Sequence, residues 1–577
     1  MGNKLRITDN YIQISVDRGD AESLKKTSQI YPIHSNRIKT EFFTSIRKID
    51  EVLEIFRGIT EENINTAPPQ VVARYTKEMQ ARSAVDRLLS RDVSFALDMQ
   101  VSSTLKLMPH QEIGREIALL RDRFCFFYDT RTGKTPLSLS IIYDDLREHP
   151  NHKWLVVCPL ILIENAWLED ARTFFPDIKT VSCHATTPKK RAEAMAQEAS
   201  IYVTNVESFA KYKEQFEAMG FHGCIVDESS TMKSYKSKTS EALVDFAQKM
   251  KRFYLLSGTP APNGEWEYYM QLKAIDFYGV QQSYTQFKEY FFVDTSFNSN
   301  YEKLVVRPDR KEELHALIKK YSLYVDKEDV LTTPGRTWHE VEFELPDDLK
   351  KHYNKMKNDL CVVLKDEKSI TAPSAAAKLN KLNQITSGFI MDTQAIKENA
   401  FYGDNLTEWY LLDDYRFKKL QELLSSDNIR DEQVLIWANY RKEFELIKGL
   451  LGERCRCIYG GTTITEKNES IRLFKSGEVQ YLIANPASAD KGLTLTNAHI
   501  CVYFSLNWSY ELFKQSMERI YGDIRKQPKH CHYYVFIASG TIDRILYSDV
   551  LQGKGDASYA VLNHLKGDNN GFSEKNF

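Results

Sequence analysis

The sequence predicts an α/β protein in which two lobes, each built on a parallel sheet, follow one another along the chain. Short apolar segments alternate with amphipathic helical stretches in two series, one between about residues 120 and 260 and one from Gln433 onward. Strands that alternate with helices form parallel sheets with helices on both faces. Helical periodicity dominates roughly residues 275–425, and the first hundred residues follow a third pattern. We therefore expect two parallel-sheet lobes in tandem, helical insertions, and a small N-terminal α+β module.

Length and composition are those of a soluble protein with several domains. The chain has 577 residues, and because a domain usually holds ~100–200 residues, three or four units are expected. It is 42% hydrophobic and 27% charged, which is ordinary for a globular protein. The net charge of −2 produces no overall positive field, so a nucleic-acid surface would have to come from local clusters of lysine and arginine.

The cysteines and the apolar runs indicate a reducing compartment and no membrane. Nine cysteines are scattered without the paired spacing of a zinc site, and we expect reduced thiols. The longest apolar run, LVVCPLILI, is far shorter than the ~20 residues of a membrane span, and the stretch MGNKLRITDN is too polar for a signal peptide. A soluble intracellular protein without a membrane partner is the expectation.

The N-terminal region differs from both lobes. YIQISVD alternates like a strand, whereas KIDEVLEIF and EMQARSAVDRLLS have helical spacing, and a polar linker follows near residues 91–104. The expected organisation is an accessory α+β module at 1–95, lobe 1 at 100–325 with a helical extension from about 275, a helical insertion at 340–425, lobe 2 at 426–560 and a flexible tail at 561–577.

Ten apolar segments are expected to form the strands of the two sheets. In lobe 1 they are RFCFFYD, WLVVCPL, IYVTN, GCIVDES and RFYLLSGTP. In lobe 2 they are QVLIWANY, CRCIYGG, VQYLIANP, HICVYFSLN and HYYVFIASG. The helical patterns between the lobes are PDDLKKHYNKMKNDLCVVLKDE and AAAKLNKLNQITSGF. The two strand series are similar in kind but are not sequence copies of one another.

The segment TGKT lies where the first strand gives way to a helix, PLSLSIIYDDLREH. Free backbone N–H groups and the positive end of a helix face an anion at such a turn. In the P-loop interpretation Lys134 neutralises phosphate charge and the Thr135 hydroxyl binds Mg2+. The complete P-loop pattern has glycine five residues before Gly133, where this chain has Tyr128. The same residues also fit a Thr/Gly turn with an exposed lysine.

A pair of carboxylates follows another apolar strand, in CIVDESS. The carboxyl ends of parallel strands are where ligands bind in doubly wound sheets. Asp227 is expected to hold the metal and Glu228 to act as the base for the attacking water. Taken alone, the pair also fits a helix cap after a strand. Its position downstream of the TGKT segment favours the nucleotide-binding interpretation.

Eight segments in this order resemble the motifs of superfamily-two helicase-like motors, and in particular Snf2-type DNA translocases, over about residues 104–555. LMPHQEIG resembles their Q motif, DTRTGKT motif I, WLVVCPLILIENAW motif Ia and IVDESSTMKSYKSKTSEAL motif II. YLLSGTPAPNGEWEYY resembles motif III, VLIWANYRKEFELI motif IV, ASADKGLTLTNAHICVYFSLNWS motif V and QSMERIYGDIRKQ motif VI. The resemblance implies two RecA-like lobes that close on ATP.

The resemblance also implies roles for individual residues. Gln111 would read the adenine edge, and motif III, Ser257-Gly258-Thr259, would couple the nucleotide state to DNA. Arg519 of motif VI would reach the γ-phosphate, where a guanidinium is worth ~10³–10⁵ in rate in other NTPases. The cofactors implied are ATP and Mg2+. The expected ATP-binding residues are Gln111, Arg131, Thr132, Gly133, Lys134 and Thr135; the expected metal ligands are Thr135 and Asp227.

The chain departs from the family pattern at three places. Motif III begins with Ser257 rather than threonine, and Arg131 replaces a loop glycine. The second motif VI arginine is missing, because Gly522 occupies its position. Arg525, one helical turn further on, either takes over that catalytic role or is an ordinary surface arginine.

Members of the family bind duplex DNA mostly through contacts to its sugar-phosphate backbone. Phosphate contacts position the protein without reading sequence. The candidates here are Lys233, Lys236, Lys238, Lys491 and Trp508. The lysines fit a solvated helix face equally well, and Trp508 also fits the core of lobe 2.

Together these features predict an ATP-dependent translocase on double-stranded DNA, resembling phage or bacterial enzymes and the fork-remodelling members of the family. It would remodel branched DNA by fork regression, branch migration or helicase-like activity in replication, recombination or repair. Alternatives are a motor that displaces proteins from DNA, with a protein partner on the N-terminal module, and a scaffold with a spent ATPase. A monomer in the cytoplasm of a bacterial or phage-infected cell is expected, since one chain carries both halves of the ATP site.

Overall fold

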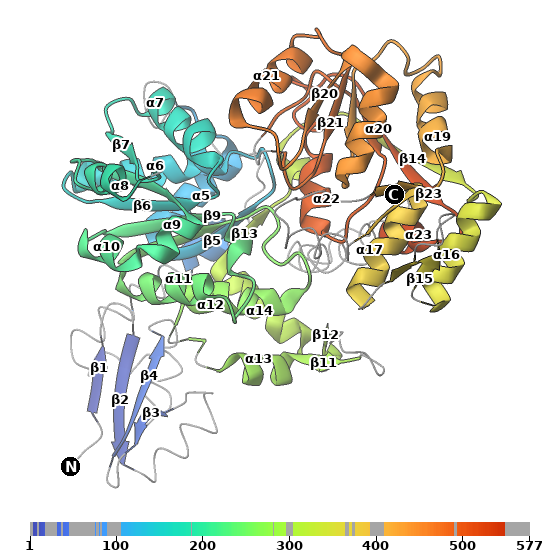
Figure 1. Cartoon of the computed structure of the whole chain (residues 1–577). Helices are drawn as coiled ribbons and strands as arrows, with labels where there is room; N and C mark the ends of the chain where they lie inside the picture. The colour runs from blue at the N-terminus through green and yellow to red at the C-terminus, as the bar shows by residue number, and fades with distance from the viewer. Residues whose placement is uncertain are drawn as a thin grey trace. The chain divides into compact units, whose positions relative to one another are not determined.

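A computed structural model describes residues 4–7, 11–17, 32–35, 39–45, 76, 80, 83–88 and 105–548, the last range with gaps at 186, 278, 281, 296–303, 360, 364–368, 372–374, 393–408 and 490–492. The chain divides into two compact units whose boundary in the sequence lies between Val330 and Leu331 (Figure 1). Each unit contains a parallel sheet covered by helices, so the predicted α/β class with two parallel-sheet lobes is confirmed. Among the described residues, none of the helices combines the length and the apolar character needed to cross a bilayer.

The first unit is organised around a seven-stranded parallel sheet with the order β13-β5-β10-β9-β6-β8-β7. Strands β6, β8 and β9 are buried along their whole length, as expected for the interior of a sheet that is covered on both faces. The strands are β5 (Arg123–Tyr128), β6 (Trp154–Cys158), β7 (Thr180–Ser182), β8 (Ile201–Asn205), β9 (Gly223–Asp227), β10 (Arg252–Leu256) and β13 (Ser322–Val325).

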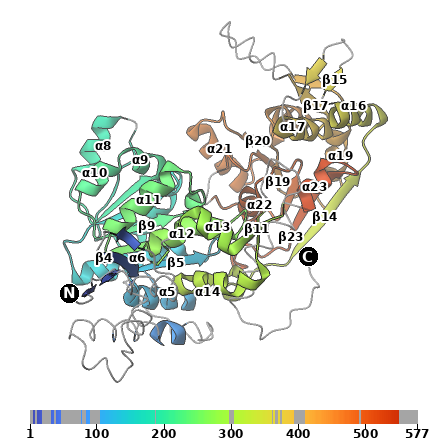
Figure 2. The same cartoon turned by 90° about the horizontal axis from the view of Figure 1, so that it is seen from below.

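Helices cover both faces of this sheet (Figure 1, Figure 2). Phe124 and Phe126 of β5 pack with helices α5 and α6, whereas Cys125 and Phe127 pack with α11 and α12 on the opposite face, because alternate residues of a strand face opposite sides. The main helices are α5 (Pro109–Leu120), α6 (Lys134–Glu148), α7 (Glu169–Phe174), α8 (Pro188–Met195), α9 (Val206–Lys211), α10 (Lys213–Ala218), α11 (Lys238–Lys249), α12 (Tyr268–Ile275), α13 (Tyr284–Phe291), α14 (Lys311–Tyr321) and α15 (Lys327–Val330).

Shorter elements connect these helices and strands. A π-helical turn, η3 (Ile163–Leu168), precedes α7, and 3-10 turns occur at η4 (Ser229–Met232), η5 (Glu265–Glu267) and η6 (Pro308–Arg310). A hairpin of β11 (Phe292–Asp294) and β12 (Leu304–Val306) follows α13.

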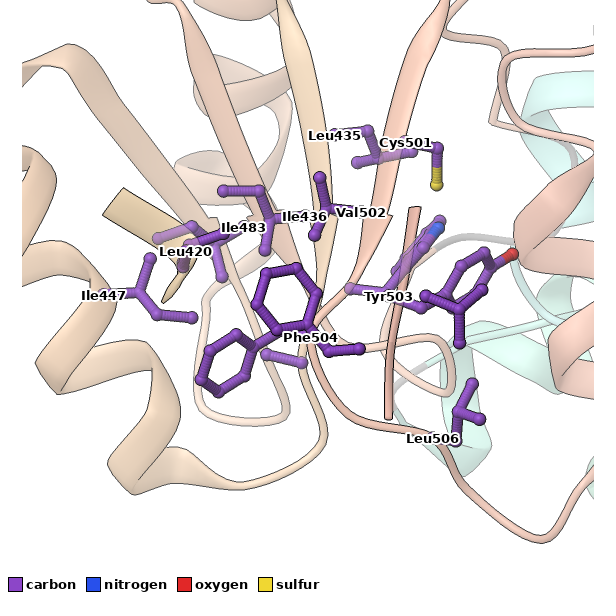
Figure 3. Close-up of a cluster of buried hydrophobic side chains, with 14 of the residues drawn as sticks. Leu420, Leu435, Ile436, Ile447, Ile483, Cys501, Val502, Tyr503, Phe504 and Leu506 are labelled. Atoms are coloured by element: carbon purple, nitrogen blue, oxygen red, sulfur yellow. The ribbon is translucent and has the colours of Figure 1, made fainter. Parts of the chain in front are cut away.

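The second unit contains a six-stranded, entirely parallel sheet with the order β14-β23-β22-β19-β21-β20. Ile436 lies on the same side of the sheet as Leu420 and Ile447, and Leu435 and Tyr503 lie on the other (Figure 3). The strands are β14 (Arg336–Phe343), β19 (Val434–Trp437), β20 (Cys455–Ile458), β21 (Tyr481–Ala484), β22 (Ile500–Tyr503) and β23 (Cys531–Ala538).

The helices of the second unit are α16 (Asp347–Asp359), α17 (Ala375–Thr386), α19 (Tyr415–Leu424), α20 (Arg441–Leu451), α21 (Ile464–Lys475), α22 (Tyr510–Met517) and α23 (Ile542–Ser548), with a 3-10 turn at η7 (Gly452–Arg454). Two hairpins accompany them: β15 (Cys361–Val363) with β16 (Ser369–Thr371), and β17 (Phe389–Met391) with β18 (Trp409–Leu411). The chain between the two series of sheet strands is therefore mixed, with short hairpins between the helices.

The N-terminal region contributes an antiparallel sheet with the order β1-β2-β4-β3. The strand predicted at YIQISVD is β2 (Tyr11–Asp17); its neighbours are β1 (Lys4–Ile7), β3 (Pro32–Ser35) and β4 (Lys39–Ser45). Residues 83–88, within the predicted helix EMQARSAVDRLLS, are helical. The predicted helix KIDEVLEIF, the linker at 91–104 and the tail at 561–577 lie outside the described residues.

Two details differ from the sequence expectations for physical reasons. The edge strands β7, β13 and β14 were not predicted. Strands β7 (TVS) and β13 (SLYV) have only three and four residues, and β14 (RTWHEVEF) is largely accessible and lacks a continuous apolar run. The helix expected throughout PDDLKKHYNKMKNDLCVVLKDE ends at Asp359, and Cys361–Val363 form strand β15. Adjacent valines favour a strand because two branched side chains restrict χ1 in a helix.

Candidate active site

The loop from Asp129 to Gly133 joins β5 to α6 through two left-handed residues. Arg131 has φ of 65° and Gly133 has φ of 83°, and Gly133 forms the N-cap of α6, which begins at Lys134. The loop therefore turns sharply and leaves the first N–H groups of α6 unpaired within the helix, which is the arrangement that binds phosphate.

Helix α5 braces this loop from the side. The Gln111 amide nitrogen donates to the carbonyl oxygens of Thr132, at 3.2 Å, and Gly133, at 3.0 Å. A Cβ atom at Gly133 would lie 1.9 Å from that nitrogen, so the Gln111 amide would have to move, and the φ of 83° itself favours glycine. His110 Nε2 lies 2.7 Å from the Thr132 oxygen, and burial lowers the pKa of His110, which keeps its ring neutral. The structure thus shows Gln111 and His110 supporting the loop backbone; adenine contact by Gln111 stays a prediction.

Lys134 lies over the end of β5. Its ammonium nitrogen donates to the carbonyl oxygens of Tyr128, at 3.0 Å, and Asp129, at 3.4 Å. Its charge also acts on Asp227 at the end of β9, where it lowers the pKa of that carboxyl against the stronger opposing effects. The cation and the carboxylate expected to meet the nucleotide are therefore near one another.

Asp227 is a buried carboxyl, 3% exposed, and within the described part of the chain no arginine is among its hydrogen-bond partners. Its oxygens accept from the indole N–H of Trp167, at 3.1 Å, and from the backbone N–H of Glu228, at 2.9 Å. Burial first, and repulsion by Glu228 second, raise its pKa to about 6, while Lys134 lowers it. A divalent cation would restore the charge of such a carboxyl, so Asp227 fits the predicted metal-binding role.

Glu228 has φ of 53°, in the left-handed region that non-glycine residues rarely adopt. A residue held there costs about 1–3 kcal/mol and persists only where the surroundings enforce it, which is common at functional sites. Thr135, in the first turn of α6, is half-buried. The Asp227–Glu228 pair thus occupies a strained strand end rather than a regular helix cap.

Ser257, Gly258 and Thr259 follow β10, which lies between β5 and β9 in the sheet. Ser257 is fully buried, and its hydroxyl accepts from the Thr259 N–H at 3.1 Å. A Cβ atom at Gly258 would come within 3.3 Å of the Thr130 nitrogen, so motif III packs tightly on the phosphate loop. The structure brings the predicted residues of motifs I, II and III together at the ends of three adjacent strands.

In the second unit, Arg519 and Arg525 have different surroundings. Arg519 follows α22 and is 7% exposed; its Nη1 donates to the Leu493 carbonyl at 3.2 Å, and its own carbonyl accepts from Leu495 at 2.8 Å. Arg525 is largely exposed, and its Nε donates to the carboxylate of Asp523 at 2.9 and 3.0 Å. Arg519 is thus fixed against motif V, whereas Arg525 forms a local ion pair.

Four of the five residues predicted to contact DNA lie within the described part of the chain, and their role stays a prediction. Lys236 and Lys238 are exposed and Lys233 is half-buried, and Lys236 lies over the ring of the exposed Tyr235. Tyr235 stacks on Tyr284 of α13 with ring centroids 3.8 Å apart, so an aromatic pair anchors this basic loop. Trp508 is 39% exposed and is not a core residue. Lys491 lies outside the described residues.

Trp167 and His110 were not among the candidate residues, although each touches one. Trp167 lies within the segment that resembles motif Ia, and a buried indole N–H requires an acceptor, which was the available signal. His110 stands directly before Gln111, but its bond to the loop spans 22 residues and has no sequence signature.

The fold and the arrangement of motifs define the class of helicase-like ATPases. Residues 70–397 match the SNF2-related domain, and residues 415–521 match the helicase conserved C-terminal domain. The chain belongs to the SNF2-related family, as the sequence resemblance predicted.

Several characterised sequences are similar to this chain. DNA annealing helicase and endonuclease ZRANB3 of Mus musculus is 25% identical over 478 residues, covering 80% of this chain and 41% of that protein. Putative protein p41 of Acyrthosiphon pisum secondary endosymbiont phage 1 is 24% identical over 442 residues, covering 72% of this chain and 88% of p41. The chain thus spans less than half the length of ZRANB3 and most of p41.

Among solved structures, the Sulfolobus solfataricus SWI2/SNF2 ATPase core in complex with dsDNA covers 82% of this chain and 98% of its own, at 19% identity and a TM-score of 0.36.

Proposed function

We propose that this chain is an ATP-dependent translocase on double-stranded DNA that remodels branched DNA. The observation that carries the proposal is the gathering of Lys134, Asp227 and motif III at the ends of β5, β9 and β10. A phosphate loop, a buried carboxyl and a coupling motif at one sheet edge are the parts that an ATP-hydrolysing motor needs.

In this proposal each residue of the first unit has a defined task. The N–H groups of α6 and the Lys134 ammonium bind the β- and γ-phosphates. Thr135 and Asp227 would hold Mg2+, which neutralises phosphate charge when bound. Glu228 accepts the proton of the attacking water. The burial of Asp227 supports its role, because a charge interaction is stronger where water is excluded.

Arg519 of the second unit is the proposed catalytic arginine, with the task of stabilising charge on the transferred phosphoryl group. This proposal is supported by the fixed position of Arg519: its carbonyl accepts from the Leu495 N–H, and its guanidinium donates to the Leu493 carbonyl. Arg525 needs to leave Asp523 before it can contribute, so Arg519 is the proposed catalytic arginine.

DNA is the proposed track. The basic loop that carries Lys233, Lys236 and Lys238 offers exposed cations next to an exposed aromatic ring, which suits a phosphate backbone. ZRANB3, which is similar to 80% of this chain, is named a DNA annealing helicase and endonuclease. Lys491 and Trp508 are the corresponding candidates in the second unit.

The rate of ATP hydrolysis in the presence of different forms of DNA tests the proposal. Turnover is measured without DNA and with linear duplex, single strand, or a four-way junction at equal nucleotide concentration. Duplex and junction are expected to raise turnover, and the junction is expected to be resolved only with ATP. Stimulation by single-stranded DNA alone would contradict a duplex translocase.

Displacement of bound protein from DNA is the second candidate, because the accessory region at 1–95 has an antiparallel sheet of its own. Release of streptavidin from biotinylated linear duplex is compared with branch migration of a protein-free junction, using the full chain in both assays. Faster protein release than junction movement would favour displacement as the main activity.

A further inference from the structure

Gln271 of α12 connects the two strand ends that carry motif II and motif III. Its amide nitrogen donates to the Pro260 carbonyl at 2.7 Å and to the Glu267 carbonyl at 3.3 Å. Its amide oxygen accepts from the hydroxyl of Ser229 at 2.8 Å. Ser229 directly follows Glu228, and Pro260 directly follows Thr259. One buried side chain therefore bonds to the residue after the proposed base and to the residue after the proposed coupling motif.

The side-chain amide of Gln271 satisfies its partners in one orientation only, and in that orientation both its oxygen and its nitrogen form hydrogen bonds. The hydroxyl of Ser229 donates to the oxygen end, and the carbonyl of Pro260 accepts from the nitrogen end. Gln271 and Ser229 are both fully buried, so no bulk water replaces either bond when it is lost. Leucine would leave both partners unpaired, and ionised glutamate would put an acceptor against the Pro260 carbonyl.

Helix α12 is itself firmly attached to the motif III loop. The carboxylate of Glu267, one residue before the helix, accepts from the backbone N–H of Asn263 at 3.1 Å and from its side-chain amide at 2.6 Å. Glu267 is 5% exposed. The loop after β10 is therefore held to α12 at two points, at Pro260 and at Asn263, whereas the turn after β9 is held to α12 through Ser229.

The strained backbone of Glu228 indicates what the hydrogen bonds of Gln271 do. A left-handed backbone at a non-glycine residue persists only where neighbouring bonds enforce it, and the Ser229 hydroxyl bond is adjacent to that residue. We propose that Gln271 is a positioning residue, which fixes Glu228 relative to Ser257–Thr259 so that the two move as one unit during ATP hydrolysis. The inference rests on the proposed function, since it assumes that Glu228 acts as the base.

The test uses the full chain with Gln271→Leu and Gln271→Glu. Gln384→Leu is the matched control, because Gln384 is a fully buried glutamine of α17 whose oxygen accepts from Met391 N–H at 3.1 Å. Each protein is measured for melting temperature, for the Kd of a non-hydrolysable ATP analogue, and for kcat and KM of DNA-free turnover per folded molecule.

Gln271→Leu is expected to bind the analogue within about twofold of the unchanged protein and to lose roughly ten- to a hundredfold in kcat, since a misplacement of ~1 Å can cost ~10²-fold. Gln271→Glu is expected to lose as much at pH 8 and to recover part of its kcat, relative to the unchanged protein, as the pH falls, because a protonated carboxyl again offers one donor and one acceptor. Gln384→Leu is expected to lower the melting temperature and leave kcat unchanged.

A Gln271→Leu protein whose kcat per folded molecule equals that of the unchanged protein would overturn the inference and leave Gln271 with a purely structural role. Turnover of the unchanged protein that no DNA raises would instead contradict the proposed translocase, while the comparison of DNA-free kcat values would still decide the role of Gln271. The two failures are therefore separate.

Discussion

Each of the two units buries an aspartate near the carboxyl end of a parallel strand: Asp227 is the last residue of β9, and Asp543 lies in α23, which follows β23. The surroundings of the two carboxylates differ greatly. Asp543 of the second unit accepts from Arg416 Nη1 at 2.7 Å, from the Ala538 N–H at 3.1 Å and from the Thr386 hydroxyl at 2.9 Å. Asp227 of the first unit has the Trp167 indole and the Glu228 N–H, and burial raises its pKa to about 6. A carboxylate with a complete set of partners stabilises a fold, whereas one left short of positive charge is suited to bind a cation.

The surroundings of Arg416 strengthen this contrast. Its remaining guanidinium nitrogens donate to the carbonyls of Phe504 and Phe536, so the buried ion pair has partners throughout. Arg416 and Asp543 are respectively 2% and 3% exposed. The buried Arg416–Asp543 pair thus stabilises the packing of α19 on the ends of β22 and β23. Arg519 is the residue of the second unit that we propose to act in catalysis.

Substitution of Arg519 is expected to cause the largest loss of ATP turnover, and it tests most directly whether the second unit supplies a catalytic charge. Arg519→Ala is expected to lower kcat for ATP by about 10³-fold or more, because a transition-state guanidinium is worth ~10³–10⁵. Arg525→Ala, which removes an exposed ion pair with Asp523, is the matched control and is expected to stay within about threefold. Equal losses in the two variants, measured as turnover with duplex DNA, would show that the second unit supplies its charge from Arg525 as well.

Lys134→Ala and Asp227→Asn are expected to lower turnover by ~10²–10³-fold, because each removes a preorganised charge from the nucleotide site. Asp145→Asn is the control: Asp145 is a buried carboxylate of the same unit that accepts from the Trp154 indole at 2.8 Å and has no proposed role. Steady-state turnover with and without added Mg2+ is the measurement. A loss for Asp145→Asn as great as that for Asp227→Asn would remove the distinction between the two buried carboxylates.

For the free energy of unfolding, the substitution of Arg416 in the second unit is expected to have the larger effect, whereas for turnover the substitution of Asp227 in the first unit does. Arg416→Ala leaves Asp543 buried without its cation, and breaking a buried pair in this way costs about 3–5 kcal/mol. Asp227→Asn removes a poorly compensated charge and is expected to be neutral or stabilising. Urea unfolding of the nucleotide-free protein, followed by probes in each unit, tests both. A destabilisation of Asp227→Asn comparable with that of Arg416→Ala would mean that Asp227 is a structural carboxylate.

The sequence could predict the strand-end residues because each follows a visible apolar run. Lys134 follows RFCFFYD and its loop, and Asp227 is the last residue of GCIVD. The parallel order of the strands brings both residues to one edge of the sheet. The fold class was predictable for the same reason. The edge strands β7, β13 and β14 were not, because the first two are very short and the third is half-exposed and carries mostly polar residues.

The residues that support the site were harder to predict, because their partners lie far along the chain. Trp167 reaches Asp227 over 60 residues, and Gln271 reaches Ser229 over 42. These bonds depend on how helices pack on the sheet, which local periodicity does not specify. A tryptophan or a glutamine in an apolar stretch signals only that its polar atom needs some partner.

The pH dependence of stability gives the smallest expected effect and refines the contrast between the carboxylates. The folded pKa of Asp227, about 6, lies above the usual value near 3.9. Between these values the folded state keeps a proton that the unfolded state has released, so the Asp227 contribution to stability falls as pH rises from about 4 to about 6 and is constant above. The stability of Asp227→Asn relative to the unchanged protein is therefore expected to increase over this window, by about 1–3 kcal/mol.

Urea titrations of the two nucleotide-free proteins at several values from pH 4 to pH 8 measure this difference. Asp170, whose pKa burial also raises to about 6, is present in both proteins and cancels. Added Mg2+ is expected to reduce the difference above pH 6, because a bound cation stabilises the ionised carboxyl in the folded state. A difference that stays flat from pH 4 to pH 8 would mean that the partners of Asp227 already compensate its charge and that it needs no cation.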